Sequence, residues 1–319
     1  MRPNLFTLPF GAHGLDIHAY GFLIALGAIA GVLLALRQGR RMGFDTADVL
    51  DLTFWALVAG IVGARFLYVL VHVSDYSRLC AGAGLPRPAL RVFGDCAAPL
   101  YIWQGGLVFY GGALAAAAVV LLFARRRSWS LGGVADLLVP SLALGHALGR
   151  VGCFLAGCCY GKVSSLGVRF PPASVAYHEL AHAGLVAPGA ASTPALAPTQ
   201  LYEALGEALL FTLLLFLRRR PRFPGSLALI YAMGYALLRA TVEVLRGDTS
   251  RGFLFELSLP RLATWLDLPA NQPLALSTAQ ALSLALGTAA AVTFSILRRQ
   301  TAQRASGTGP ITPGSASAP

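Results

Sequence analysis

Long apolar segments alternate with short polar ones along most of the chain. Four are the clearest, at residues 20–36, 105–123, 227–245 and 275–297. Each reaches the roughly 20 residues that a helix needs to cross about 30 Å of hydrocarbon. Three further segments, near residues 49–73, 131–150 and 199–217, contain polar residues but are long enough. The pattern predicts an all-α membrane protein in which residues 20–298 form one domain of about seven transmembrane helices.

Arginines cluster after every second predicted helix, and this periodicity indicates the orientation of the chain. Basic residues in short loops stay on the cytoplasmic side of a membrane. We therefore expect an external N-terminal segment at residues 1–19, without a cleavable signal peptide, and a cytoplasmic C-terminus. The clusters are Arg37, Arg40 and Arg41; Arg125, Arg126 and Arg127; Arg218, Arg219, Arg220 and Arg222; and Arg298, Arg299 and Arg304.

The loops on the opposite side are longer and contain many prolines and glycines. They cover residues 74–104, 158–198 and 246–273, and we expect them to form a small external head. Residues 171–198 are rich in Ala, Pro and Ser, which is typical of a mobile surface loop. Residues 299–319 contain little that could form a core, and we expect a disordered cytoplasmic tail.

Composition supports the membrane interpretation and changes how the charge is interpreted. The chain is 56% hydrophobic and only 12% charged, whereas soluble domains have about 25% charged residues. The net charge of +11 resides largely in clusters beside predicted helices, where the lipid bilayer explains it. We expect no nucleic-acid partner.

The five cysteines fall into two groups. Cys80 and Cys96 share one external loop, where they form either a disulfide or two free thiols. Cys153, Cys158 and Cys159 follow the fourth predicted helix, and no histidine or carboxylate lies near them at the spacing of a metal site. The sequence therefore predicts no metal and no other cofactor.

Charged residues also lie inside the predicted helices, where insertion costs about 2.5–3.5 kcal/mol each. They are Arg65, Arg150, Arg239 and Glu243. Arg239 and Glu243 are four residues apart and share a helix face, so an internal ion pair is one interpretation. Arg65 and Arg150 have no close acidic neighbour in their own helices. The apparent surplus of positive charge favours an anionic ligand within the membrane, because guanidinium groups bind phosphate through paired hydrogen bonds.

Polar aromatic and amide side chains accompany these arginines, among them Tyr20, Tyr110, Gln200 and Tyr235. Membership of an interfacial aromatic belt would also explain the tyrosines. Tyr235 precedes Arg239 by one helical turn and shares its face. Glycine pairs before and after Tyr110 permit close approach of either a ligand or another helix.

Together these motifs resemble the bacterial prolipoprotein diacylglyceryl transferases, from residue 20 to residue 246. Gly149-Arg150-Val151-Gly152-Cys153-Phe154, continued to Gly161, is similar to the family signature. The supporting blocks are Gly63-Ala64-Arg65 with Tyr68; Trp103-Gln104-Gly105-Gly106 with residues 109–112; Pro198-Thr199-Gln200-Leu201-Tyr202-Glu203; and Tyr235 with Arg239, Glu243 and Arg246.

The resemblance implies transfer of diacylglycerol from phosphatidylglycerol to the lipobox cysteine of an exported prolipoprotein. The products are a thioether and glycerol phosphate, made at a periplasm-facing site in the bacterial inner membrane. On this basis Arg150 and Arg239 bind the phosphate, and Glu243 orients Arg239. Tyr20, Tyr235, Arg65 and Gln200 are the remaining candidates for binding the lipid.

The chain departs from the family pattern at the residue expected to accept the proton of the thiol. Tyr110 stands where a histidine is common, and Cys153, Ala156 and Cys158 stand where Asn, Asn and Glu are usual. His146, one turn before Arg150, is a substitute base, although a buried histidine bonded to a carbonyl is the simpler explanation. Tyr110 is the other candidate.

Three functional hypotheses remain open: the transferase itself; a paralogue with another acceptor, or a non-catalytic protein that binds anionic phospholipid; and an anion transporter. The absence of a clear internal repeat argues against the transporter.

Overall fold

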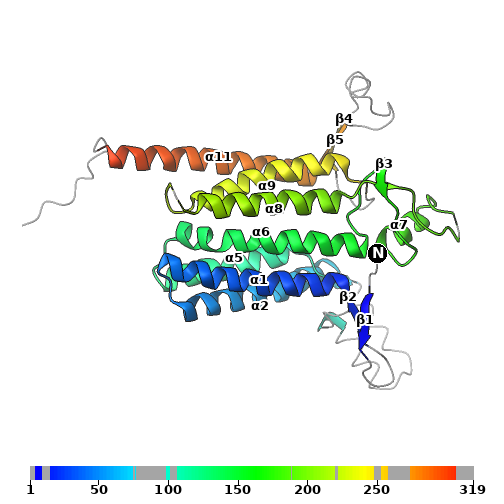
Figure 1. Cartoon of the computed structure of the whole chain (residues 1–319), viewed down its shortest axis with the longest axis horizontal. Helices are drawn as coiled ribbons and strands as arrows, with labels where there is room; N and C mark the ends of the chain where they lie inside the picture. Colours follow the sequence, from blue (N-terminus) through cyan, green and yellow to red (C-terminus); the bar gives the residue numbers. More distant parts are fainter. Residues whose placement is uncertain are drawn as a thin grey trace, which may run out of the picture. The chain divides into compact units, whose positions relative to one another are not determined.

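The computed structural model describes residues 4–8, 15–74, 76, 98–100, 106–187, 189–219, 222–247, 253–257 and 274–306. Within them, seven helices are long and apolar enough to cross a membrane. They are α1 (Ala19–Met42), α2 (Thr46–Val71), α5 (Phe109–Arg126), α6 (Leu131–Ala156), α8 (Thr199–Leu217), α9 (Ser226–Leu245) and α11 (Thr278–Ala305) (Figure 1). The predicted helical membrane fold is confirmed, and the chain is a multi-pass membrane protein.

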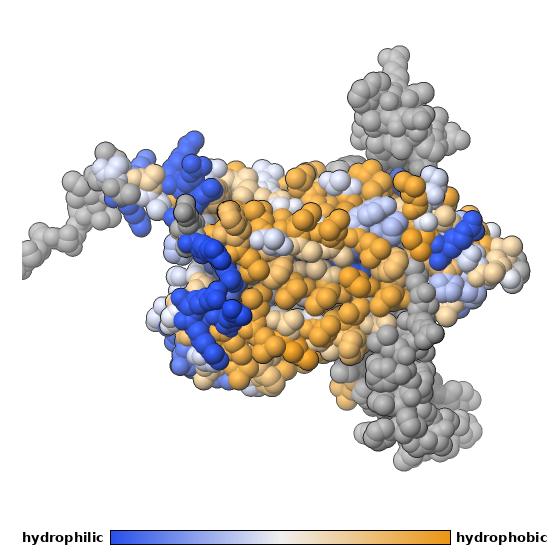
Figure 2. Space-filling view, viewed as in Figure 1, coloured by the Kyte–Doolittle hydropathy of each residue, from blue (hydrophilic) through white to orange (hydrophobic). Residues whose placement is uncertain are grey.

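Apolar side chains cover most of the helical surface on the face that Figure 2 shows. Examples are Phe66 on α2, Leu114 on α5 and Phe216 on α8, which are 67%, 71% and 76% exposed. Large apolar side chains exposed along a helix of this length are solvated by lipid rather than by water.

The shorter elements lie between or before the long helices. Antiparallel hairpins precede α1 and α11: β1 (Asn4–Leu8) pairs with β2 (Leu15–His18), and β4 (Phe253–Leu257) pairs with β5 (Leu274–Ser277). The remaining elements are a 3₁₀ turn, η2 (Ala98–Leu100), and β3 (Val163–Val168) with α7 (Val175–His182). The apolar pattern did not predict the hairpins.

The chain divides into two compact units, one formed by Met1–Leu34 with Ala135–Pro319 and the other by Ala35–Val134. In the second unit, glycines bring α2 and α5 into close contact. A Cβ atom on Gly63 would lie 2.6 Å from the carbonyl oxygen of Gly111, and one on Gly112 would lie 2.8 Å from that of Gly60. Helix packing therefore accounts for the glycines that follow Tyr110.

In the first unit, α6, α8 and α9 share an apolar core. Val139 and Ala143 of α6 pack with Leu214 of α8 and with Tyr231 of α9. The buried carboxylate of Asp136 accepts hydrogen bonds from the backbone N–H groups of Gly225 (2.8 Å) and Ala228 (3.0 Å). These are donors that the first turn of α9 leaves unpaired, so Asp136 is a cap supplied by a neighbouring helix.

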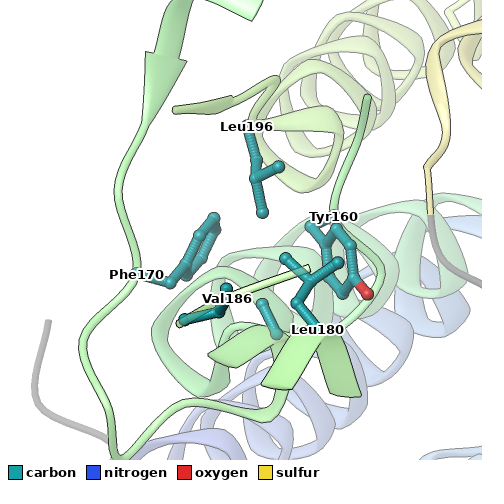
Figure 3. Close-up of a cluster of buried hydrophobic side chains, with 6 residues drawn as sticks. Tyr160, Phe170, Leu180, Val186 and Leu196 are labelled. Carbon is teal, nitrogen blue, oxygen red and sulfur yellow. The ribbon is translucent and has the colours of Figure 1, made fainter. Parts of the chain in front are cut away.

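Residues 157–197 form a small packed head, so the mobile surface loop expected at residues 171–198 is wrong. The external location of the head and the contribution of the other two loops stay predictions. Tyr160, Phe170, Leu180, Val186 and Leu196 point toward one another and are buried (Figure 3). Ser174 caps α7 by accepting a hydrogen bond from the N–H of Tyr177. The composition of residues 171–198 did not indicate this core, because the apolar residues that form it are widely spaced among small ones.

The predicted start of the C-terminal tail is also corrected, because α11 continues to Ala305 rather than ending near residue 298. Residues 300–305 are mostly good helix formers. The proposed Cys80–Cys96 disulfide, Trp103 and Gln104 lie outside the described residues.

The α2–α5 contact predicts unequal effects of adding a methyl group at two helical glycines. We expect Gly63→Ala to lower the free energy of unfolding by about 1–3 kcal/mol, because the added methyl group overlaps α5. Gly21→Ala is the matched control, since nothing lies within 4 Å of its Cβ position. Unfolding midpoints by circular dichroism in mixed detergent micelles would measure both, and equal midpoints would refute the close contact.

Candidate functional site

Three helices of the first unit each contribute two charged or ionisable side chains spaced four residues apart. Such residues share one face of a helix, and here the three faces meet. The resulting charged cluster is defined as His146 and Arg150 of α6, Glu203 and Glu207 of α8, Arg239 and Glu243 of α9, and Arg246 just after α9.

Glu203 is the centre of this cluster. Its side chain is 2% exposed, and its Oε1 lies 2.9 Å from Nη2 of Arg150. Its Oε2 lies 3.7 Å from Nη1 of Arg239. One carboxylate from α8 therefore holds guanidinium groups from both α6 and α9.

The ion pair expected within α9 is present, with Nη2 of Arg239 2.7 Å from Oε2 of Glu243. Nε of Arg246 lies 3.9 Å from the same oxygen. The cluster contains three arginines and three glutamates, so the surplus of positive charge expected at Arg150 is wrong. The sequence argument considered only partners within each helix, whereas Arg150 finds its partner on α8.

His146 is held by charged side chains rather than by a backbone carbonyl. Its Nε2 accepts a hydrogen bond from Nε of Arg150 at 3.2 Å, and its Nδ1 lies 2.8 Å from Oε1 of Glu207. Because Nε2 is an acceptor, the proton of the neutral ring is on Nδ1 and faces the carboxylate. The hydroxyl of Tyr231 donates to Oε2 of Glu207 at 3.2 Å. A carboxylate placed in this way fixes the orientation and the tautomer of the imidazole.

Among the buried polar atoms of the site that lack a hydrogen-bond partner in the described residues are Nη1 of Arg239, a donor, and Oε1 of Gln200, an acceptor. Nη1 of Arg239 keeps only the long ion-pair contact with Glu203. Gln200 is fully buried, and its Nε2 donates to the backbone carbonyl of Cys158 at 2.7 Å. Buried polar atoms rarely remain unpaired in native proteins, so this donor and this acceptor are available to a ligand.

Two of the predicted tyrosines contact the helices of the cluster. The ring of Tyr235 lies 5.3 Å from the ring of His146 and stacks on Tyr231 at 6.0 Å. Tyr20 opens α1 and packs against Gly152 of α6, where a Cβ atom would lie 3.2 Å from its ring. Of the predicted residues, the first unit thus contains Tyr20, His146, Arg150, Gln200, Tyr235, Arg239 and Glu243.

Arg65 and Tyr110 belong to the second unit. Arg65 donates from Nε to the carbonyl of Pro99 at 2.8 Å and from Nη1 to that of Gly106 at 3.2 Å. Its guanidinium also lies 5.4 Å from the ring centre of Tyr68. These contacts hold the backbone around Gly106. Tyr110 is 53% exposed and makes an edge contact with Phe109.

The turn after α6 brings together the free thiols of Cys153, Cys158 and Cys159, whose sulfur atoms all lie within 4.8 Å of one another. Hydrogen bonds with Cys153 and Cys158 lower the pKa of the Cys159 thiol well below its usual value. Hydrogen bonds with Cys153 and Cys159 raise the pKa of the Cys158 thiol. Cys159 is therefore the first of these two to ionise.

Sequence reasoning missed the importance of α8. It named Glu203 and Arg246 without assigning them a role, and it passed over Glu207. The available signal was the four-residue spacing of Glu203 and Glu207 in an apolar helix, which is the same spacing that drew attention to Arg239 and Glu243.

The position of Glu203 predicts that removing its charge is costly. We expect Glu203→Gln to lower the free energy of unfolding by about 3–5 kcal/mol, because two partly buried guanidinium groups lose their shared partner. Asp48→Asn removes the carboxylate of a pair with Arg127, which is 49% exposed, at 2.6 Å. Asp48→Asn should lower the free energy of unfolding by about 1 kcal/mol or less. Denaturant titration of both variants in detergent tests this order; similar losses would contradict it.

Similarity to known proteins agrees with the motifs and the fold. A sequence model of the family described as "Prolipoprotein diacylglyceryl transferase" matches residues 7–296. The chain is 33% identical over 251 residues to the phosphatidylglycerol–prolipoprotein diacylglyceryl transferase of Clostridium tetani, covering 78% of this chain and 86% of the relative. It is 35% identical over 247 residues to the enzyme of that name from Synechococcus elongatus, covering 74% and 75%. The chain therefore belongs to the prolipoprotein diacylglyceryl transferase family.

Proposed function

We propose that this protein transfers the diacylglyceryl group of phosphatidylglycerol to the thiol of a lipobox cysteine in a prolipoprotein. The products are a thioether-linked lipoprotein precursor and glycerol phosphate. The observation that carries the proposal is the donor Nη1 of Arg239, which is buried in a membrane helix without a hydrogen-bond partner and shares Glu203 with Arg150. The phosphodiester of a phospholipid is an anion that can reach this depth, because the acyl chains of the lipid lie in the bilayer.

The charged cluster binds the lipid phosphate through its arginines. Each guanidinium has five N–H donors, and the glutamates hold Arg150 and Arg239 side by side without using all of them. Glu203 and Glu243 fix the two groups before the lipid arrives, so less ordering is needed on binding. The unpaired Oε1 of Gln200 accepts a hydrogen bond from a hydroxyl of the glycerol headgroup.

In the proposed reaction the acceptor thiol loses its proton, and its sulfur attacks the glyceryl carbon that carries the phosphate. A C–S bond forms, the C–O bond to phosphate breaks, and its electron pair leaves with glycerol phosphate. The departing phosphate gains negative charge, which Arg239 and Arg150 stabilise. These donors are in place before the charge develops.

His146 accepts the proton of the thiol at Nε2, and Glu207 stabilises the imidazolium that results. Arg150 occupies this nitrogen in the structure, so phosphate binding must draw the guanidinium away from Nε2. A thiol has a pKa near 8.5 and imidazole near 6.5, which makes the transfer feasible at neutral pH, whereas a neutral phenol is a poor acceptor. Tyr110, which belongs to the other unit, remains the alternative base.

We further propose that the site faces the periplasm from the bacterial inner membrane. The cluster occupies the second half of α6, the start of α8 and the end of α9. These are the helix ends that join the loops expected outside, and they lie opposite the arginine clusters. The acceptor, an exported prolipoprotein with its signal peptide in the membrane, would meet the lipid at this depth.

Loss of the buried guanidinium should abolish transfer without removing the protein from the membrane. We expect Arg239→Ala to lower kcat/KM about 10²–10³-fold, since stabilisation of the departing phosphate is lost. Arg125→Ala, in the last turn of α5, is the control. This variant should retain full activity. The assay follows labelled diacylglycerol from phosphatidylglycerol to a lipobox peptide; equal activity of the two variants would overturn the assignment.

The base can be identified from the pH dependence of transfer. If His146 accepts the proton, wild-type activity falls at acidic pH, because a protonated imidazole accepts no proton. His146→Gln should lower kcat about 10²–10⁴-fold and remove this acidic limb, whereas Tyr110→Phe should keep it. The reverse pattern would assign the base to Tyr110.

A family member with another acceptor is separated from a prolipoprotein transferase by complementation. We expect the chain to restore growth and lipoprotein modification in a bacterium that lacks its own transferase. Failure to rescue by a chain that binds phosphatidylglycerol and reaches the membrane would favour the paralogue.

A further inference from the structure

The turn after α6 adopts an unusual backbone that gathers its three cysteines. Gly157 has φ +76°, and Cys159 has φ +60°, a left-handed conformation that few residues other than glycine adopt. Neighbouring side chains of α8 hold the turn by its carbonyl groups: Gln200 donates to that of Cys158, and Thr199 donates to that of Cys159. Hydrogen bonds to its backbone carbonyls thus hold the turn in place. The three sulfur atoms lie within 4.8 Å of one another.

The proposed transfer reaction uses none of these thiols. At the end of α6 the Cys158 thiol makes a long hydrogen bond, 3.7 Å to the carbonyl of Cys153, which backbone groups also satisfy. The N–H groups of Gly157 and Cys158 close that end by donating to the carbonyl of Cys153 at 2.9 and 3.1 Å. Three thiols grouped this closely can be oxidised or can bind a metal ion. Their grouping therefore suggests that they have a ligand of their own.

We propose that Cys153, Cys158 and Cys159 bind one Cu(I) ion through three sulfur ligands. Soft thiolates select Cu(I), Zn²⁺ or iron–sulfur clusters. Structural Zn²⁺ sites take four protein ligands, usually with tetrahedral geometry, whereas the group found among the described residues offers three ligands, all of them sulfur. The sequence expectation of no metal rested on the lack of a histidine or carboxylate at suitable spacing, and a purely sulfur site requires neither.

Distance and charge are compatible with such a site. Metal–sulfur bonds of about 2.3 Å in a trigonal site place the sulfur atoms about 4 Å apart, so small side-chain movements suffice. Arg150 and Arg246 act electrostatically on Cys159, and their positive charges offset the negative charge that three thiolates and a monovalent ion leave. Since Cys153 follows Arg150 by three residues, a bound ion would also fix the end of the helix that carries Arg150.

Titration of the purified full-length chain with Cu(I), buffered by a chromophoric chelator under anaerobic reducing conditions, tests the site. We expect one Cu(I) per chain in the wild type. The control variant Cys80→Ser with Cys96→Ser, which keeps only the three clustered thiols, should bind equally well. Cys153→Ser, Cys158→Ser and Cys159→Ser should each weaken binding at least about tenfold, as loss of one of three ligands requires.

X-ray absorption of the Cys80→Ser, Cys96→Ser protein loaded with Cu(I) provides a test that does not depend on folding of the three single variants. Only sulfur neighbours at about 2.3 Å are expected. Nitrogen or oxygen ligands, loss of binding in this control variant, or unchanged binding in Cys158→Ser would each overturn the proposal. Neither measurement depends on transferase activity, so failure here leaves the proposed reaction untouched.

Discussion

Glu203 illustrates the constraint on which the first unit depends: charge inside an apolar bundle must be paired. It contacts Arg150 on one helix and Arg239 on another. A charged residue in the middle of a membrane helix costs several kcal/mol without such a partner. Because each of α6, α8 and α9 contributes two members of the cluster, the pairing also fixes how these helices face one another. The ion pairs that make charged residues tolerable in these helices therefore also align the helix faces.

The helix α6 connects the fold of this unit with its chemistry. Asp136 near its start caps α9, while Val139 and Ala143 pack into the shared core. His146 and Arg150 follow on the same helix, and Cys153 lies in its last turns. Rigid placement of reactive groups on one packed helix is more exact than placement on loops. Residues that stabilise the bundle are thus followed, along one element, by the residues proposed to bind substrate.

The departures from the family pattern acquire a physical interpretation in this arrangement. Tyr110 stands where the resemblance implies a histidine, yet an imidazole oriented by a carboxylate is present in His146 with Glu207. Cys153 and Cys158 stand where the resemblance implies an amide and a carboxylate, and together with Cys159 they form a compact sulfur group. The proposed reaction needs a base and an anion site, and both lie within the charged cluster. The thiols are then free to bind a metal.

The sequence by itself determined the seven helices, the membrane as their surroundings and the family, because apolar segment length and local motifs depend only on residues near one another in the chain. It also identified Arg150, Arg239, Glu243 and His146. It did not predict that Glu203 balances two arginines, that Glu207 holds His146, or that small residues and scattered apolar side chains build the head. Those facts depend on which helix faces meet and on how distant segments pack. Charge balance and close packing are properties of neighbours in space, which only the tertiary structure decides.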